Sequence, residues 1–235
     1  MAESGRIRRE AYVAPYARIR TDADAKRNTE AGLTREQRTA LDNWESRNRN
    51  YKTERAAVVD ENGNVNPRGN IMVRRDRYGR MVEATSGSGS RVFINPARVP
   101  ENSVLTHNHP SNNAGIAGRV GQAFSGADLR IAVVTNAKEI RAVTPNYVYS
   151  IKRPAKGWTF DRSIEYEADR LFERHYNQYL SQTRTMARNN TKRGGTWTRD
   201  DEDVYRNRIM VTANDRMMQE LARKYGFRYT RRRSS

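Results

Sequence analysis

The pattern of hydrophobic and polar positions changes twice along the chain. Residues 1–33 carry many charges with little periodicity, which predicts a basic N-terminal arm with no core of its own. The middle of the chain alternates short apolar runs with turn-forming residues, which is typical of strands. Past residue 153, apolar residues recur at three- and four-residue spacing, which indicates long helices.

The first regular element is a short helix expected over 34–49. Thr34 and Gln37 stand at the spacing of a capping box, and Leu41 and Trp44 form a sparse apolar face. A domain over 50–153 follows. Its expected strands lie at 55–59, 71–73, 81–84, 92–94, 104–106, 139–143 and 147–151. One helix, beginning at Ser125, interrupts them, so the fold class is α+β.

The segment 154–235 is predicted to be a basic helical C-terminal extension. Helices are expected over 161–189 and near 200–225, with Gly194 and Gly195 between them. The residues from 228 to 235 are expected to form a basic tail.

The chain is strongly basic. The chain has 235 residues, with 44 Lys and Arg against 27 Asp and Glu, which gives a net charge of +17. Mean hydropathy is −1.00, so the core is only a fraction of the chain. A protein this basic attracts nucleic acid, acidic proteins or anionic membrane surfaces, and charge alone does not choose among them. The densest basic runs, expected to contact DNA phosphates without sequence preference, are Arg6, Arg8 and Arg9, and Arg231, Arg232 and Arg233.

Several protein classes are excluded. The chain has no cysteine, so disulfide scaffolds and cysteine-ligated zinc are ruled out. No apolar stretch is long enough to span a membrane, and the first residues lack the apolar segment of a secretory signal. We therefore expect synthesis in the cytoplasm.

Candidate metal chemistry begins with two of the three histidines, His107 and His109. Side chains alternate along a strand, so His-x-His places both imidazoles on one side. Asp128, in the first turn of the following helix, offers a third ligand. Two imidazoles and a carboxylate leave a Zn²⁺ ion with one open position for water. Such a water needs a separate carboxylate to take its proton.

Glu54, just before the strand at 55–59, is the first choice for that base, and Glu83 is the second. Ser125 could steady the developing oxyanion. A purely structural reading stands beside this one. His109 could simply end a strand, and Ser125 and Asp128 could simply cap a helix.

The order His-x-His-Pro followed by Ser-x-x-Asp resembles the signature of the JAB/MPN (JAMM) metalloprotease domains, including their RadC-like branch. The resemblance covers residues 50–153. It implies a JAB/MPN-like mixed β-sheet core with flanking helices, and cleavage of an amide bond in a peptide, an isopeptide or a ubiquitin-like tail. The implied roles are zinc ligation by His107, His109 and Asp128, acid–base catalysis by Glu54 and oxyanion stabilisation by Ser125. The segment 111–124 is longer than the corresponding spacing in the family.

A narrower resemblance is to the C-terminal module of Mu F-like minor head proteins of tailed phages. It rests on the segments 103–110, 124–128, 139–143, 149–158 and 222–229. It implies a phage or prophage setting, synthesis in the host cytoplasm, a place inside the virion head, and head or portal-type proteins as partners.

Three functions are therefore open. The first is a zinc-dependent hydrolase of peptide or isopeptide bonds. The second is a non-enzymatic head or DNA-ejection protein whose basic surface contacts DNA and portal-type partners. The third is a basic nuclease or toxin that uses His107 or His109 as a base. A metal-dependent HNH nuclease needs a further metal-binding histidine, and only His175 remains, far downstream.

Overall fold

The fold is mixed α+β, and strands both precede and follow the two long helices of the C-terminal part. A computed structural model describes residues 32–51, 54–66, 73–75, 81–83, 94, 96–109 and 123–234. Their elements are α2 (Arg35–Asn48), β1 (Ala56–Val59), β2 (Val73–Arg75), β3 (Met81–Glu83), the 3-10 turn η2 (Pro96–Arg98), β4 (Val104–Asn108), α4 (Gly126–Val134), β5 (Glu139–Val143), β6 (Tyr147–Lys152), α5 (Ile164–Lys192), α6 (Arg199–Tyr225) and β7 (Arg228–Arg233).

The main sheet has five strands in the order β1-β4-β5-β6-β7. β4 and β5 run parallel, with α4 as the crossover between them, and the other neighbours are antiparallel. β2 and β3 form a separate antiparallel pair. Because side chains alternate along β4, His107 and Thr106 project from opposite faces of this sheet.

The face that carries His107 holds the larger hydrophobic core. Leu105, Ile140 and Ile151 of the sheet are buried there together with residues of α4, α5 and α6. The start of α4 lies so close to α5 that a Cβ on Gly126 would sit 2.6 Å from the carbonyl oxygen of Glu165. A glycine at this position therefore allows the approach that seats α4 on the sheet.

The opposite face is covered by α2, and much of this layer is ionic. Leu41 of α2 is buried with Val59 and Val104. Beside them Glu45 lies 3.2 Å from Arg141 of β5, and both side chains are almost fully enclosed. Burial raises the pKa of Glu45, although Arg141 and Arg232 oppose the shift.

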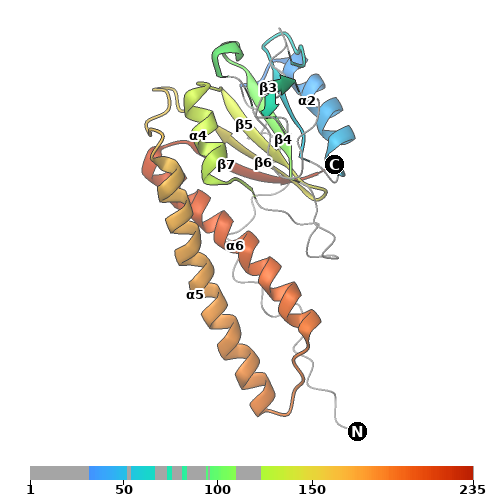
Figure 1. Cartoon of the computed structure of the whole chain (residues 1–235), viewed down its shortest axis with the longest axis vertical. Helices are drawn as coiled ribbons and strands as arrows, with labels where there is room; N and C mark the ends of the chain where they lie inside the picture. Colours follow the sequence, from blue (N-terminus) through green and yellow to red (C-terminus); the bar gives the residue numbers. More distant parts are fainter. Residues whose placement is uncertain are drawn as a thin grey trace.

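Helices α5 and α6 form a long antiparallel pair that extends away from the sheet (Figure 1). α6 returns to the sheet and ends at Gly226, whose left-handed backbone (φ 73°) suits a glycine. Within the described residues, no helix has the length and apolarity needed to cross a membrane.

Most expected elements are present with shifts of one to three residues. β2 lies at 73–75 instead of 71–73, and α5 covers 164–192 instead of 161–189. The expected strand at 92–94 falls mostly outside the described residues.

The expected basic tail at 228–235 is wrong for most of its length, because 228–233 forms β7 at the edge of the sheet. The predicted helical extension therefore also supplies a strand. The arginine-rich sequence of 228–233 does not indicate a strand. The strand forms because 228–233 pairs with β6, which lies far away in the chain.

Candidate metal centre

The two histidines stand at the end of β4, as the His-x-His spacing predicts. The Nε2 atoms of His107 and His109 lie 2.9 Å apart. His107 is enclosed by the core, and its ring packs near Phe124. His109 is partly exposed, so the pair reaches from the core toward solvent.

Asp128 completes a triad with these histidines. Ser125 is the N-cap of α4, and a capping box joins it to Asp128. The Ser125 hydroxyl and amide both donate to Oδ2 of Asp128, at 2.7 Å each. The other carboxylate oxygen, Oδ1, lies 3.3 Å from Nε2 of His107. The capping interaction therefore turns one oxygen of Asp128 toward the histidines.

The donor set fits a metal ion. One potential ligand atom from each of the three residues lies within 4.8 Å of the others. Ligands at ~2.1 Å from a tetrahedral zinc are separated from one another by roughly 3.4 Å. The distances of 2.9 and 3.3 Å around His107 are close to that value. A possible metal-binding triad is therefore present, and the geometry by itself does not select the metal.

The electrostatics favour the ligand state of His107 and Asp128. Burial lowers the pKa of His107 to about 4, against the opposing effect of Asp128. A neutral imidazole has a lone pair free for a metal. Burial alone raises the pKa of Asp128, but the two histidines and the hydrogen bonds from Ser125 outweigh it, and the net shift is downward.

Glu54 lies on the same side of the sheet as the triad. Ala56 of β1 is paired with His107, and residues two apart on an extended strand share a face. Burial, reinforced by the charge of Asp128, raises the pKa of Glu54 to about 8. Glu54 is thus a half-buried carboxyl that stays mostly protonated at neutral pH in the metal-free chain. Its pKa depends on the charge of Asp128.

Asn108, between the two histidines, holds the segment that carries Glu54. Its Oδ1 accepts from the amide of Arg55 at 2.7 Å, and its Nδ2 donates to the carbonyl of Tyr51 at 3.2 Å. Its own amide donates to the carbonyl of Arg55 at 3.0 Å. Asn108 is not among the site residues predicted from the sequence. Its position opposite the histidines on the strand is the signal that could have found it.

Asn214 of α6 is a second missed residue. It is buried, its Oδ1 accepts from the amides of Ala123 and Phe124, and its Nδ2 donates to the carbonyl of Phe124. These bonds fix the chain just before Ser125. No local signal in the sequence points to a contact across ninety residues.

Several predicted residues lie outside the part of the chain that the structure describes. Glu83 is the last residue of β3, and its side chain is outside the described part, as are Arg6, Arg8, Arg9 and the segment 110–122.

The C-terminal arginines are mostly engaged within the protein. Arg231 lies 3.1 Å from Asp215, and Arg232 is buried with its Nη2 3.8 Å from Glu45. Of these three arginines, only Arg233 is exposed. The interpretation of Arg231 and Arg232 as a free basic tail is therefore wrong, because β7 directs them toward carboxylates of α6 and α2.

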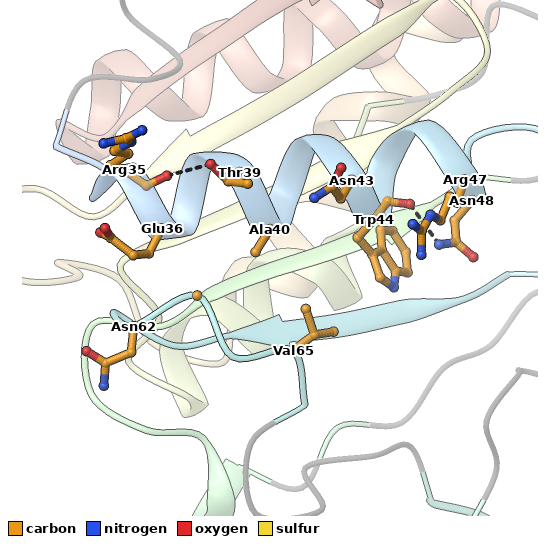
Figure 2. Close-up of a pocket in the computed structure, with 11 residues that line it drawn as sticks. Arg35, Glu36, Thr39, Ala40, Asn43, Trp44, Arg47, Asn48, Asn62 and Val65 are labelled. Carbon is orange, nitrogen blue, oxygen red and sulfur yellow. Dashed lines mark hydrogen bonds between the residues drawn. The ribbon is translucent and has the colours of Figure 1, made fainter.

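A groove lies elsewhere, between the outer side of α2 and the turn after β1 (Figure 2). Ala40, Trp44 and Val65 give it an apolar wall, with Arg35 and Arg47 toward its two ends. None of the triad residues lines it.

The comparisons with known proteins return nothing: no family model, no curated protein and no solved structure matches this chain.

Proposed function

We propose that this chain is a zinc-dependent hydrolase of peptide or isopeptide bonds, with His107, His109 and Asp128 as the metal ligands. The proposal is supported by the triad and by Glu54, a carboxyl outside the triad whose pKa is raised by the charge of Asp128. β4 supplies the histidines, α4 supplies Asp128, and the segment before β1 supplies Glu54. The resemblance to JAB/MPN domains adds the same assignment of roles and a JAB/MPN-like fold.

Each residue has a defined task in this proposal. Zinc, when bound, acidifies a coordinated water and polarises the scissile carbonyl. Glu54 accepts the proton as the water oxygen bonds to the carbonyl carbon. It then delivers that proton to the nitrogen as the C–N bond breaks. In the metal-free chain, burial and the charge of Asp128 raise the pKa of Glu54 to about 8, so this carboxyl can hold a proton between the two transfers. Ser125, exposed at the start of α4, is the proposed oxyanion partner.

A phage or prophage setting is part of the proposal and rests on the resemblance to Mu F-like minor head proteins. A second candidate, a non-enzymatic head protein that contacts DNA, is favoured by the net charge of +17.

The test combines metal content with turnover in four proteins made under zinc-replete conditions. Wild type, Glu54→Gln and His175→Ala are expected to hold about one zinc ion per chain, and His109→Ala is expected to lose it. His175→Ala is the matched control, because that histidine pairs with Glu220 on the helical hairpin. Zinc is measured by elemental analysis.

Turnover is measured in a cell extract by labelling newly formed primary amines and identifying them by mass spectrometry. Wild type and His175→Ala should release amines, while zinc-loaded Glu54→Gln should lose at least a hundredfold of that rate. Absence of zinc from the wild type would overturn the metal site. Zinc binding without amine release in any protein would instead favour the non-enzymatic candidate.

A further inference from the structure

The part of the helical hairpin between the middle of α5 and the start of α6 has basic residues and no acidic ones in its own sequence. From 174 to 199 the sequence contains six basic residues and no acidic one: Arg174, Arg184, Arg188, Lys192, Arg193 and Arg199. All six are exposed. Arg174 pairs with Glu220, whereas the other five form no ion pair among the residues that the structure describes. Solvent is therefore the only counterpart of these five charges in the described part of the chain.

Three of these cations form a stripe on α5. Arg184, Arg188 and Lys192 follow one another at four-residue spacing, which keeps them on one side of a helix. At a rise of 1.5 Å per residue the stripe is ~12 Å long. Met186, on the other side of α5, is partly buried. The stripe lies near the end of the hairpin that is farthest from the sheet (Figure 1).

The residues around the stripe indicate which kind of polyanion it fits. The exposed positions of α5 between 181 and 192 are all polar or basic. Insertion of α5 into a membrane surface would need an apolar face, and stacking of single-stranded nucleic acid would need exposed aromatic rings. Neither is present among these residues. Ser181, Gln182 and Asn189 offer neutral donors of the kind that bind phosphate oxygens.

Duplex DNA offers a dense row of anions to this surface. It carries one negative charge per ~1.7 Å of its axis with both strands counted, so ~12 Å of duplex holds about seven phosphates for the three cations of the stripe. The major groove of DNA also admits a helix, whereas the deep groove of duplex RNA does not. We propose that the Arg184–Arg188–Lys192 stripe binds the phosphate backbone of double-stranded DNA without sequence preference.

The acidic residues at 200–203 set one limit of this surface. They open α6, on the other side of the hairpin turn. Asp201 is engaged in the capping box with Thr198, and Glu202 pairs with Arg206. DNA therefore meets α5 and not the first turn of α6. The proposal is independent of the metal centre.

The test compares two variants of the full chain that lose the same charge. The stripe variant is Arg184→Gln, Arg188→Gln and Lys192→Gln. The control is Arg98→Gln, Lys156→Gln and Arg162→Gln, which are also exposed cations. Binding to a fluorescein-labelled DNA duplex is measured by anisotropy over a range of salt concentrations, with circular dichroism as the check on folding.

The stripe variant should bind more than tenfold more weakly, and its plot of log affinity against log salt should be shallower by about 2.7, or 0.9 per lost phosphate contact. The control should change affinity by less than about threefold. Equal losses in both variants would overturn the proposal, because net charge alone would then explain binding. Equally tight binding to duplex RNA or to polyglutamate would overturn the assignment to DNA. The single charge reversal Arg188→Glu supplies the same comparison if the triple variant does not fold.

Discussion

Asp128 can cap α4 and can also bind a metal, and each role uses a different carboxylate oxygen. One oxygen accepts from Ser125 in the capping box, and the other faces His107. The structural interpretation of Ser125 and Asp128 as a helix cap is confirmed. Capping does not compete with metal binding, because it uses the oxygen that points away from the histidines. The ligand role of Asp128 stays a prediction.

Glu54 gives the residue-scale prediction, which concerns the metal-free protein. Its folded pKa of about 8 lies above the unfolded value of 4.5, so its contribution to stability is complete below pH 4.5 and is lost as pH rises toward 8. Glu54→Gln cannot ionise and escapes this loss. Partial solvent exposure screens the effect, so we expect about 2–4 °C, equivalent to roughly 1 kcal/mol.

The measurement is the melting temperature in EDTA near the two ends of this pH window. The difference between Glu54→Gln and wild type should become more positive at the alkaline end. Glu101→Gln, on an exposed turn, is the control and should show no such trend. A constant difference for Glu54→Gln would mean that this carboxyl is not buried beside Asp128.

At the scale of elements, α2 meets the sheet through a buried ionic layer beside its thin apolar face. Glu45 accepts from Thr106 and lies beside Arg141, with Arg232 of β7 also near. Arg141 also has a second carboxylate neighbour, Glu139, at 3.5 Å. Three elements therefore share one buried carboxylate.

Removing that carboxylate should be costly. Glu45→Ala leaves Arg141 and Arg232 enclosed with less compensating charge, and breaking a buried pair in this way costs about 3–5 kcal/mol. The free energy of unfolding, measured in urea, should fall by this amount. Glu36→Ala removes an exposed acid from the first turn of the same helix and should cost under about 1 kcal/mol. Similar losses in both variants would contradict the importance of the buried layer.

At the scale of the whole molecule, the C-terminal segment supports the candidate site built by the middle of the chain. α6 reaches across with Asn214 to fix residues 123 and 124, directly before the cap of α4. β7 closes the edge of the sheet beside β6. The helical hairpin is therefore part of the framework that positions Asp128, and its far end carries the basic stripe.

Asn214→Ala tests this coupling. The substitution removes three buried hydrogen bonds and leaves main-chain groups without partners, which should lower the free energy of unfolding by about 2–3 kcal/mol. If the metal site is as proposed, zinc affinity should also fall about tenfold or more, because Asp128 loses its support. Scanning calorimetry measures the stability, and titration calorimetry on the folded protein measures the zinc affinity. Asn177→Ala, an exposed asparagine of α5, is the control and should change neither. Unchanged stability in Asn214→Ala would contradict the coupling.

Features that depend on neighbours in the sequence could be predicted from the sequence alone. The capping boxes at Thr34, Ser125 and Thr198 close within a single turn, so three residues carry the whole signal. The His-x-His spacing likewise needs only the two-residue period of a strand. These local rules gave the α+β class, most element positions and the three candidate ligands.

Only the tertiary structure decided what those elements meet. β7 exists because β6 is beside it, and Arg231 and Arg232 are engaged because β7 aims them at Asp215 and Glu45. The raised pKa of Glu54 comes from burial and from a charge far away in the chain. Pairing, burial and long-range charge depend on distances in space, and a single sequence does not contain those distances until the chain has folded.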